Sequence, residues 1–415
     1  MNLFGPLRGL TGPQWRAFTA AYLGWMLDAF DYFIVVMVID RIAEDFHTKI
    51  SAVSYALFLT LAFRPIGALL FGIVADRFGR RPAMMGSILL YAAVELASGF
   101  APTLSAFIAL RALFGIGMGG EWGVGASLAM ESVPAESRGL LSGILQQGYP
   151  AGNLLAAVAA WVLLPLIGWR GMFMVGAVPA VLVIFIRLHV PESPAWEQRD
   201  REAKADPKRR TAETAAALRT RWPLLLYMVV LMAAFNCFSH GTQDLYPKGF
   251  LGSQRHLAQA TISKITIVTS LGAIAGGLLF GGLSQAIGRR KAIAASALLA
   301  LPMIPLWVGS SSVLGLAIGG FLIQFAVQGA WGVVPAHLNE LAPAAVRGTL
   351  PGFAYQLGNL GASYLGPFQA KLAEAHDGSY AFALGSVVAV VAVVLAILAL
   401  VGPEARTAEL AAGPT

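Results

Sequence analysis

Long apolar runs separated by short polar stretches dominate the chain, and each run could form a membrane-spanning helix. A helix needs about 20 predominantly apolar residues to cross the hydrocarbon core of a bilayer. The pattern predicts twelve such helices and therefore an all-α membrane protein. The expected spans are residues 17–40, 51–74, 82–101, 103–128, 139–164, 169–189, 222–245, 262–284, 290–309, 312–338, 347–368 and 379–402.

The longest polar stretch, residues 194–221, separates the first six expected spans from the last six. We therefore expect a six-helix bundle at 1–193, a cytoplasmic linker at 194–221 and a second six-helix bundle at 222–415. Lys and Arg concentrate in cytoplasmic loops, so the linker side and both termini are expected in the cytoplasm, with the protein in the cell inner (plasma) membrane. The basic residues of the linker are Arg199, Arg201, Lys204, Lys208, Arg209, Arg210, Arg219 and Arg221.

Composition supports the membrane prediction and excludes several classes of protein. The chain is 57% hydrophobic and 12% charged, whereas soluble proteins contain about 25% charged residues. Basic loops account for the net charge of +7, so we expect no nucleic-acid partner. The single cysteine, Cys237, excludes an intramolecular disulfide and a Cys-rich metal site. Phosphate-binding loops, zinc-protease helices and nucleophile elbows are missing from the sequence, so we expect no metal, no cofactor and no enzymatic activity. We also expect the protein to be a monomer in the bilayer.

The two predicted bundles are related to each other by a constant sequence offset of 209 residues. A single unbroken offset predicts two parallel, pseudo-equivalent halves with a solute site near mid-membrane between them. The offset also places Asp31 opposite His240 and Asp28 opposite Cys237. Related positions include Gly79-Arg80-Arg81 with Gly288-Arg289-Arg290, Glu131 with Glu340, Arg138-Gly139 with Arg347-Gly348, and Gln147 with Gln356.

Ionisable residues inside the expected spans are candidates for function. A charged side chain at the bilayer centre costs roughly 2.5–3.5 kcal/mol on insertion scales, so such residues should face a wet or protein-lined cavity. Asn236, His240 and Asp244 are four residues apart and share one helical stripe. Asp28 and Asp31 share a face of the first span, either as titratable groups or solute contacts, or as structural partners of an arginine such as Arg64 or Arg111.

Arg64, in the second expected span, is a candidate counter-ion for an anionic solute, because a guanidinium matches a carboxylate bidentately. The alternative is a permanent ion pair with Asp28 or Asp31. Gln147 and Gln356 are polar groups inside spans that could line the cavity or bond between helices. Glu95 and Glu121 have no expected role.

The turn after the second span has a distinctive sequence, Gly72-x-x-x-Asp76-Arg77-x-Gly79-Arg80-Arg81. It resembles the signature loop of the major facilitator superfamily, and it recurs in weaker form 209 residues later. The resemblance implies the fold of two six-helix bundles and says little about substrate. We expect the loop to be a structural latch, with a part in gating as the alternative. Glu131 with Arg138, and Glu340 with Arg347, are expected as charge pairs that stabilise one conformer and break in the other, with ordinary surface pairs worth ~0–1 kcal/mol as the alternative.

Arg111, in Leu110-Arg111-Ala112-Leu113-Phe114-Gly115-Ile116-Gly117, resembles the arginine motif of the superfamily's fourth span. That motif usually has Gln where this chain has Phe114. The resemblance implies a part in proton coupling, and a structural ion pair is the alternative.

The stretch Asn236-x-x-Ser239-His240-x-Thr242-Gln243-Asp244 resembles the signature of the sialate/proton symporter family, nearest its lactate/pyruvate permease branch. Leu245-Tyr246-Pro247 continues the likeness, whereas Lys248 stands where the family has Thr. The resemblance implies a set of solute- and proton-linked positions. They are Asn236, Ser239, His240, Thr242, Gln243 and Asp244.

The expected function is proton-coupled symport of a small organic monocarboxylate such as lactate or pyruvate. A proton would load onto His240–Asp244 or onto an aspartate of the first span, and Arg64 would hold the anion. Histidine suits this task because its reference pKa is about 6.5. The alternatives are sialic acid or another larger carboxylate as solute, an organic-acid or drug exporter of the same fold, and a receptor that binds solute without moving it.

Overall fold

The computed structural model describes residues 5–205, 213, 216–217, 219–406, 408 and 410, and these residues form helices and connecting turns without a strand. The expected all-α membrane fold is therefore confirmed. The basic linker residues Lys208, Arg209 and Arg210 lie outside the described part of the chain.

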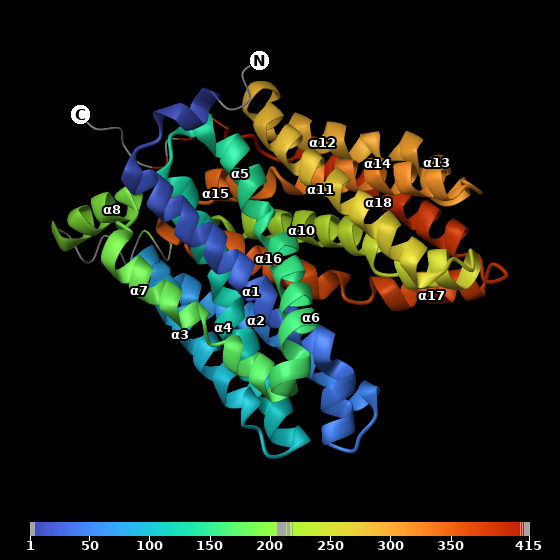
Figure 1. The fold of residues 1–415 in the computed structure, drawn as a ribbon. Helices are drawn as coiled ribbons and strands as arrows, with labels where there is room; N and C mark the ends of the chain where they lie inside the picture. Colours follow the sequence, from blue (N-terminus) through green and yellow to red (C-terminus); the bar gives the residue numbers. More distant parts are fainter. Residues whose placement is uncertain are drawn as a thin grey trace.

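The helices of the first half follow one another closely and form the lower bundle in Figure 1. They are α1 (Gly12–Asp45), α2 (Ile50–Phe78), α3 (Arg80–Gly99), α4 (Leu104–Ser132), α5 (Arg138–Gln146), α6 (Gly148–Val175) and α7 (Pro179–His189). A surface helix, α8 (Pro194–Ala205), follows α7.

The second half forms the bundle that extends to the right in Figure 1. Its helices are α10 (Trp222–Gln243), α11 (Gln259–Ile287), α12 (Arg289–Leu299), α13 (Ile304–Gly309), α14 (Val313–Trp331), α15 (Val334–Leu341), α16 (Leu350–Ala362), α17 (Leu365–Glu374) and α18 (Tyr380–Val401). A π-helical segment, η3 (Tyr246–Gln254), continues α10.

Ten segments of the described chain are long and apolar enough to span a bilayer. One of them, Ala135–His189, contains the expected fifth and sixth spans. These two spans separate at Gly168, whose φ of +65° is a left-handed conformation that glycine adopts without strain. The expected eleventh span is divided between α16 and α17, because residues 363 and 364 form a turn.

Equivalent ion pairs in the two halves show the internal repeat in three dimensions. Arg80 Nε donates to Glu131 at 3.1 Å, and Arg289 Nε donates to Glu340 at 2.9 Å. Each pair joins the first residue of a helix, α3 or α12, to a glutamate 51 residues later. The same side-chain geometry therefore recurs at the offset of 209 found in the sequence.

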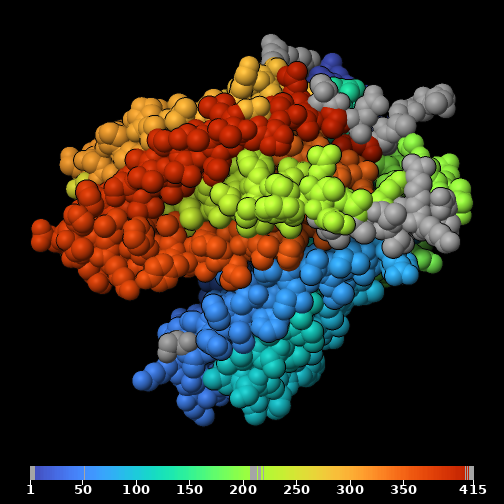
Figure 2. Space-filling view, turned by 180° about the vertical axis from the view of Figure 1, so that it is seen from behind, coloured from blue at the N-terminus to red at the C-terminus, as the bar shows by residue number. Residues whose placement is uncertain are grey.

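The two bundles meet at one end and diverge towards the other (Figure 1), and the space-filling view shows the separated lobes from behind (Figure 2). We call the end that carries the turns at 76–81 and 285–291 the basic side. There, a Cβ at Gly123 would lie 2.6 Å from Cα of Gly352, so only glycine permits this backbone approach between α4 and α16.

Both described ends of the chain also lie on the basic side. The Ser137 hydroxyl donates to the carbonyl of Pro6 at 3.0 Å. Arg138 Nη1 donates to the carbonyl of Ala408 at 2.7 Å, and Arg347 Nη1 donates to that of Leu410 at 3.4 Å. The carboxyl-terminal segment therefore crosses the junction between the two bundles.

Candidate functional site

Arg64 of α2 and Asp28 of α1 form a buried ion pair in the first half. Arg64 Nη2 lies 3.6 Å from Asp28 Oδ2, and the side chains are 3% and 0% exposed. Neither carboxyl oxygen of Asp28 has a hydrogen-bond partner among the described residues. The two groups neutralise each other, and the long contact leaves Arg64 with unused donors, because Nε and Nη2 are also unpartnered.

An aromatic cluster formed by both halves lies within electrostatic range of this ion pair. Tyr355 of α16 stacks on Trp122 of α4 with ring centroids 4.5 Å apart. Trp25 of α1 packs edge-on against Trp122 and lies 5.3 Å from Tyr149 of α6. Tyr355 and Tyr149 both interact electrostatically with Arg64 and Asp28. The guanidinium therefore lies where helices of both halves meet, lined by rings with polar edges.

The polar stripe on α10 forms a second cluster, in the other half. His240 Nδ1 lies 3.1 Å from Asp244 Oδ2, and the two side chains are 43% and 46% exposed. Asn359 of α16 lies beside the imidazole. The spacing of four residues brings these groups together on one helical face, as the sequence predicts.

Gln324 of α14 ties the end of α10 to its neighbour. Its amide nitrogen donates to Thr242 Oγ1 at 2.8 Å, and its amide oxygen accepts from Gln243 at 3.2 Å. Gln243 also donates to Ser239 at 3.0 Å. Gln324 falls in the expected span 312–338, but the sequence does not assign it to the site, because nothing in the sequence shows that α14 lies beside α10.

Tyr32 of α1 lies within electrostatic range of both clusters. It interacts electrostatically with Arg64 of its own half and with Asp244 of the other half. The candidate site is therefore the region between Arg64–Asp28 and His240–Asp244, bordered by Tyr32, Tyr149 and Tyr355. The sequence did not single out Tyr32 or Tyr355, since neither belongs to a recognised motif.

Arg111 has a different partner from the aspartates considered in the sequence. Its Nη1 lies 2.7 Å from Glu95 Oε2, and its Nη2 donates to Ser98 at 2.6 Å. The guanidinium also lies 4.4 Å from the ring centroid of Phe114, in the position where the motif usually has Gln. Asp31 is fully buried and interacts electrostatically with Arg111 and Glu95, without a direct ion pair.

The remaining polar candidates bond mainly within their own helices. Asn236 donates to the carbonyl of Met232 at 2.8 Å and is buried. Gln147 donates to the carbonyl of Gly143 at 3.3 Å, at the break between α5 and α6. Gln356 is 1% exposed, and its amide has no partner among the described residues. Its neighbour Tyr355 reaches the aromatic cluster.

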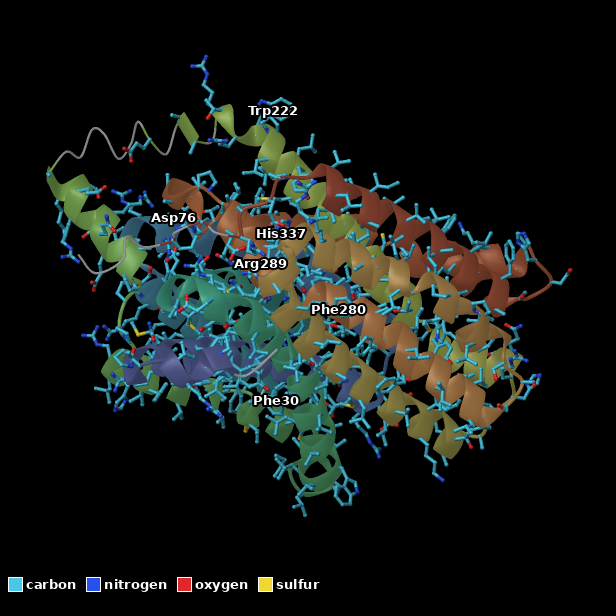
Figure 3. All side chains as sticks on the ribbon, turned by 90° about the horizontal axis from the view of Figure 1, so that it is seen from above. Phe30, Asp76, Trp222, Phe280, Arg289 and His337 are labelled. Atoms are coloured by element: carbon cyan, nitrogen blue, oxygen red, sulfur yellow. The ribbon has the colours of Figure 1, made fainter. Side chains whose placement is uncertain are left out.

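At the basic side, Asp76 of the first half caps the start of α16 in the second half. Its carboxylate accepts hydrogen bonds from the backbone of Gly348 at 2.8 Å, from Thr349 Oγ1 at 2.7 Å and from Arg80 at 2.9 Å. Gly72 lies against the backbone of Thr349, where a Cβ would be 2.5 Å from its Cα. Asp76 and Arg289, from the two related turns, are labelled in Figure 3.

The charge pairs expected within each half are exchanged between the halves. Glu131 lies 3.5 Å from Arg347 of the second half, and Glu340 lies 4.0 Å from Arg138 of the first half. The expectation that Glu131 pairs with Arg138 and Glu340 with Arg347 is therefore wrong. The offset of 209 identifies equivalent residues, but it does not reveal that each glutamate lies beside an arginine of the opposite half. We call these four residues the basic-side seam.

The rest of the turn motif fixes the path of the chain. Gly79 has a φ of +112°, which a residue with a Cβ rarely adopts. Glu192 accepts hydrogen bonds from the backbone N–H groups of Arg80 and Arg81. Burial raises the pKa of the Glu192 carboxyl, although those N–H groups act in the opposite direction. Arg77 lies 5.4 Å from the ring centroid of Phe78.

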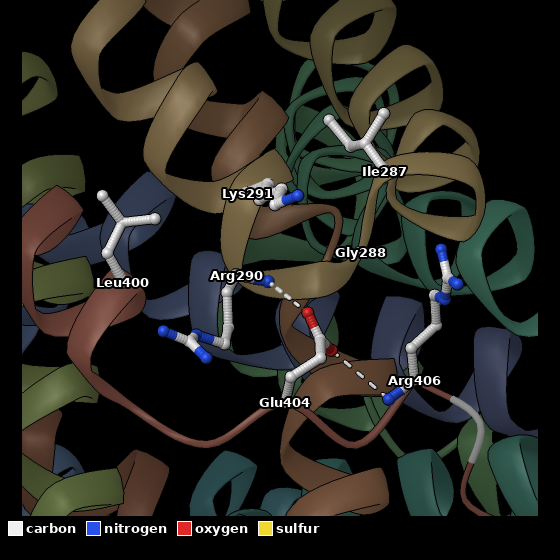
Figure 4. Close-up of a pocket in the computed structure, with 7 residues that line it drawn as sticks. All are labelled: Ile287, Gly288, Arg290, Lys291, Leu400, Glu404 and Arg406. Atoms are coloured by element: carbon white, nitrogen blue, oxygen red, sulfur yellow. Dashed lines mark hydrogen bonds between the residues drawn. The ribbon is translucent and has the colours of Figure 1, made fainter.

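A pocket also occurs beside the corresponding turn of the second half (Figure 4). Glu404 accepts hydrogen bonds there from the backbone N–H groups of Arg290 and Arg406. The pocket lies on the basic side, at the opposite end of the second half from His240 and Asp244, so it is separate from the candidate site.

Comparison with known families places the chain among membrane transporters. Residues 21–247 match the Major Facilitator Superfamily model, and residues 224–407 match the model described as Sugar (and other) transporter. The two matches together cover both bundles.

Individual relatives and solved structures agree with this result. A carboxylic acid transporter protein homolog of Saccharomyces cerevisiae is 30% identical over 91% of this chain, which spans 64% of that protein's length. The sialic acid transporter NanX of Escherichia coli is 30% identical, with 84% of this chain and 85% of that protein covered. A structure of the proton:xylose symporter XylE superimposes with a TM-score of 0.74 at 19% identity, covering 94% of this chain and 96% of that one, which shows a shared fold.

Proposed function

Because the chain belongs to the Major Facilitator Superfamily, we propose that it is a secondary active transporter for small organic monocarboxylates of the lactate or pyruvate type. Transport would be coupled to protons and would cross the cell inner membrane. The observation that carries this proposal is the buried Arg64 beside an aromatic region formed by both halves.

The geometry of Arg64 suits an anionic solute. Its contact with Asp28 is 3.6 Å long, and two of its nitrogens have no hydrogen-bond partner among the described residues. A carboxylate can accept two parallel hydrogen bonds from a guanidinium, which fixes its orientation as well as its position. Tyr355 and Tyr149 are beside the same guanidinium and would contact the remainder of a small solute.

The names of two relatives support a carboxylate as the class of solute. One is a carboxylic acid transporter homolog, and the other is a sialic acid transporter. Carboxylic acids and sialic acid are anions at neutral pH, so a transporter of either solute would need a cationic group in its binding site. Sialic acid or another larger carboxylate is the second candidate, because the NanX relative is as similar in sequence as the yeast relative.

The proposed orientation follows the positive charges. The basic side, with both described chain ends, would face the cytoplasm. The proposed division is a first bundle at 1–193, a linker at 194–221 and a second bundle at 222–415. In this conformation the bundles are in contact at the basic side and diverge towards the other end, so rocking about the site would alternate access.

The proton-linked groups are proposed from the same geometry. His240–Asp244 in the second half, and Asp28 or Asp31 in the first, are the alternatives. A stoichiometry of one proton with one monoanion would move no net charge. Accumulation would then follow the pH gradient and not the membrane voltage.

A thermal-shift screen of the purified protein against a panel of carboxylates tests the class of solute. We expect stabilisation by lactate or pyruvate, because a ligand that binds only the native state raises its stability. Competition for uptake between lactate and sialic acid separates the two candidates. If hexoses or cationic compounds stabilise the protein and carboxylates do not, the proposal is wrong.

A further inference from the structure

The first half contains more buried acids than buried bases. Away from the basic side, four carboxyl groups in its membrane-spanning helices are fully buried, whereas only two of the described arginine residues there are at most 2% exposed. The acids are Asp28, Asp31, Glu95 and Glu121, and the bases are Arg64 and Arg111.

Each arginine is taken by one acid, which leaves two acids without a cation. Arg64 pairs with Asp28, and Arg111 pairs with Glu95. Among the described residues, no cationic group lies within 4 Å of the carboxyl groups of Asp31 or Glu121, and none of their oxygens has a hydrogen-bond partner. A carboxylate that is buried without a cation or a donor is strongly disfavoured relative to the neutral acid.

This excess of acids is specific to the first half. At the offset of 209, the positions equivalent to Glu95, Glu121, Arg64 and Arg111 are the uncharged residues Ile304, Ala330, Ala273 and Gly320. Packing symmetry alone therefore does not require Glu121, and sequence motifs assign it no role.

Glu121 lies next to the proposed anion site. Its carboxyl rests against α1, where a Cβ on Gly24 would be 2.2 Å from Glu121 Oε1. The charged and titratable groups that face it are Asp28 of α1, Arg64 of α2 and Tyr91 of α3. Tyr91 is fully buried with an unpartnered hydroxyl, and it interacts with all four acids.

We propose that Glu121 is a proton-binding site of the transporter and is loaded as a neutral carboxylic acid in this conformation. On loading, a proton passes from hydronium to a carboxylate oxygen of Glu121, forming an O–H bond and leaving water. On release, that bond breaks and water on the other side accepts the proton. Asp31 is a second neutral carboxylic acid in the same conformation.

The position of Glu121 gives an order of binding, and this step rests on the proposed function. With Glu121 neutral, the group of Glu121, Asp28 and Arg64 carries no net charge, so an anion approaches Arg64 without repulsion. When both solute and proton have left, these three residues carry one negative charge, which equals the charge of the three residues and the solute together when both are bound. Trp122, the next residue, stacks on Tyr355, so separation of the bundles at this stack changes the surroundings of Glu121.

Infrared spectroscopy of the purified protein tests the proton directly, through the carbonyl stretch of neutral carboxylic acids. At neutral pH we expect Glu121→Gln and Asp31→Asn each to remove one such band from the wild-type spectrum, whereas Glu44→Gln, at an exposed position, removes none. If the bands of wild type and Glu121→Gln are identical, Glu121 is ionised and the inference is wrong. This result does not depend on the identity of the solute.

Proteoliposomes test the role in coupling. A one-unit pH gradient drives roughly tenfold accumulation through one coupled proton. Glu121→Gln should exchange labelled for unlabelled solute across the membrane but accumulate none against its gradient, while Glu44→Gln accumulates it as the wild type does. Accumulation by Glu121→Gln at the wild-type ratio would contradict the inference. If the wild type accumulates no carboxylate, the proposed function fails, and the infrared experiment still decides the state of Glu121.

Discussion

Arg64 and Asp28 are buried together, with 3.6 Å between the guanidinium nitrogen and the carboxylate oxygen. Arg64 keeps unpartnered donors in this contact, and Tyr355 of the opposite half lies beside it. One side chain thus combines a positive charge, exclusion from lipid and a position between the two bundles.

Replacing Arg64 with Ala should abolish solute binding, and replacing it with Lys should weaken it. Hydrogen bonds to charged groups contribute about 1.5–3 kcal/mol each, so loss of one changes affinity roughly tenfold to a hundredfold. Lysine keeps the charge but cannot donate two parallel bonds. Isothermal titration with the carboxylate found in the thermal-shift screen measures the change. Arg41→Ala, in an exposed pair with Glu44, is the matched control, and equal affinities for Arg64→Lys and wild type would refute the assignment.

Removing Arg347 should loosen the contact of the bundles at the basic side. Glu131 keeps its bonds to Arg80, so we expect a loss of about 1–3 kcal/mol for this conformation, and not the larger cost of an isolated buried charge. Spin labels at Phe78 and Ile287, at the basic ends of α2 and α11, in a Cys237→Ser background, report the separation of the bundles. Distances should lengthen in Arg347→Ala. Unchanged distances would show that the seam is not what holds the bundles together.

A side chain at Gly123 should prevent closure at the basic side, because its Cβ would lie 2.6 Å from Cα of Gly352. Gly123→Val is therefore expected to eliminate most uptake while solute still binds from the basic side. Gly366→Val is the control, since a Cβ there meets nothing within 4 Å. Normal uptake by Gly123→Val would mean that transport does not require this backbone contact.

His240 and Glu121 can be distinguished by their effects on coupling. If Glu121 carries the coupled proton, His240→Gln should raise the KM for solute several-fold and leave the accumulation ratio near tenfold per pH unit. If His240 carries it, accumulation disappears in His240→Gln. Uptake by proteoliposomes at several solute concentrations and two external pH values separates the outcomes. Asn359→Ala removes a hydrogen-bond partner of His240 and leaves the imidazole in place, so it shows whether a change in KM arises from the orientation of the imidazole alone.

The sequence predicted the fold well because hydrophobic length and internal repetition are local or linear properties. The repeat correctly related Arg80–Glu131 to Arg289–Glu340, which have equivalent contacts in the structure. The eleventh span was predicted as continuous, although residues 363 and 364 divide it into α16 and α17. Hydropathy does not detect such a break, because both parts remain apolar.

The site was predicted less completely, because its contacts join residues far apart in the chain. Helical spacing was enough to bring His240 to Asp244, whereas the partner of Arg111 proved to be Glu95, on a different helix. The crossing of Glu131 to Arg347 also depends on how the two bundles meet. No sequence offset contains that information.

The most direct test of the central claim is the accumulation of labelled lactate by proteoliposomes under an imposed pH gradient. With the lumen one unit more alkaline than the medium, the account predicts roughly tenfold accumulation, unchanged when a potassium diffusion potential is added and absent in Arg64→Ala. Uptake that does not depend on the pH gradient, or that persists in Arg64→Ala, would contradict the proposed proton-coupled transport.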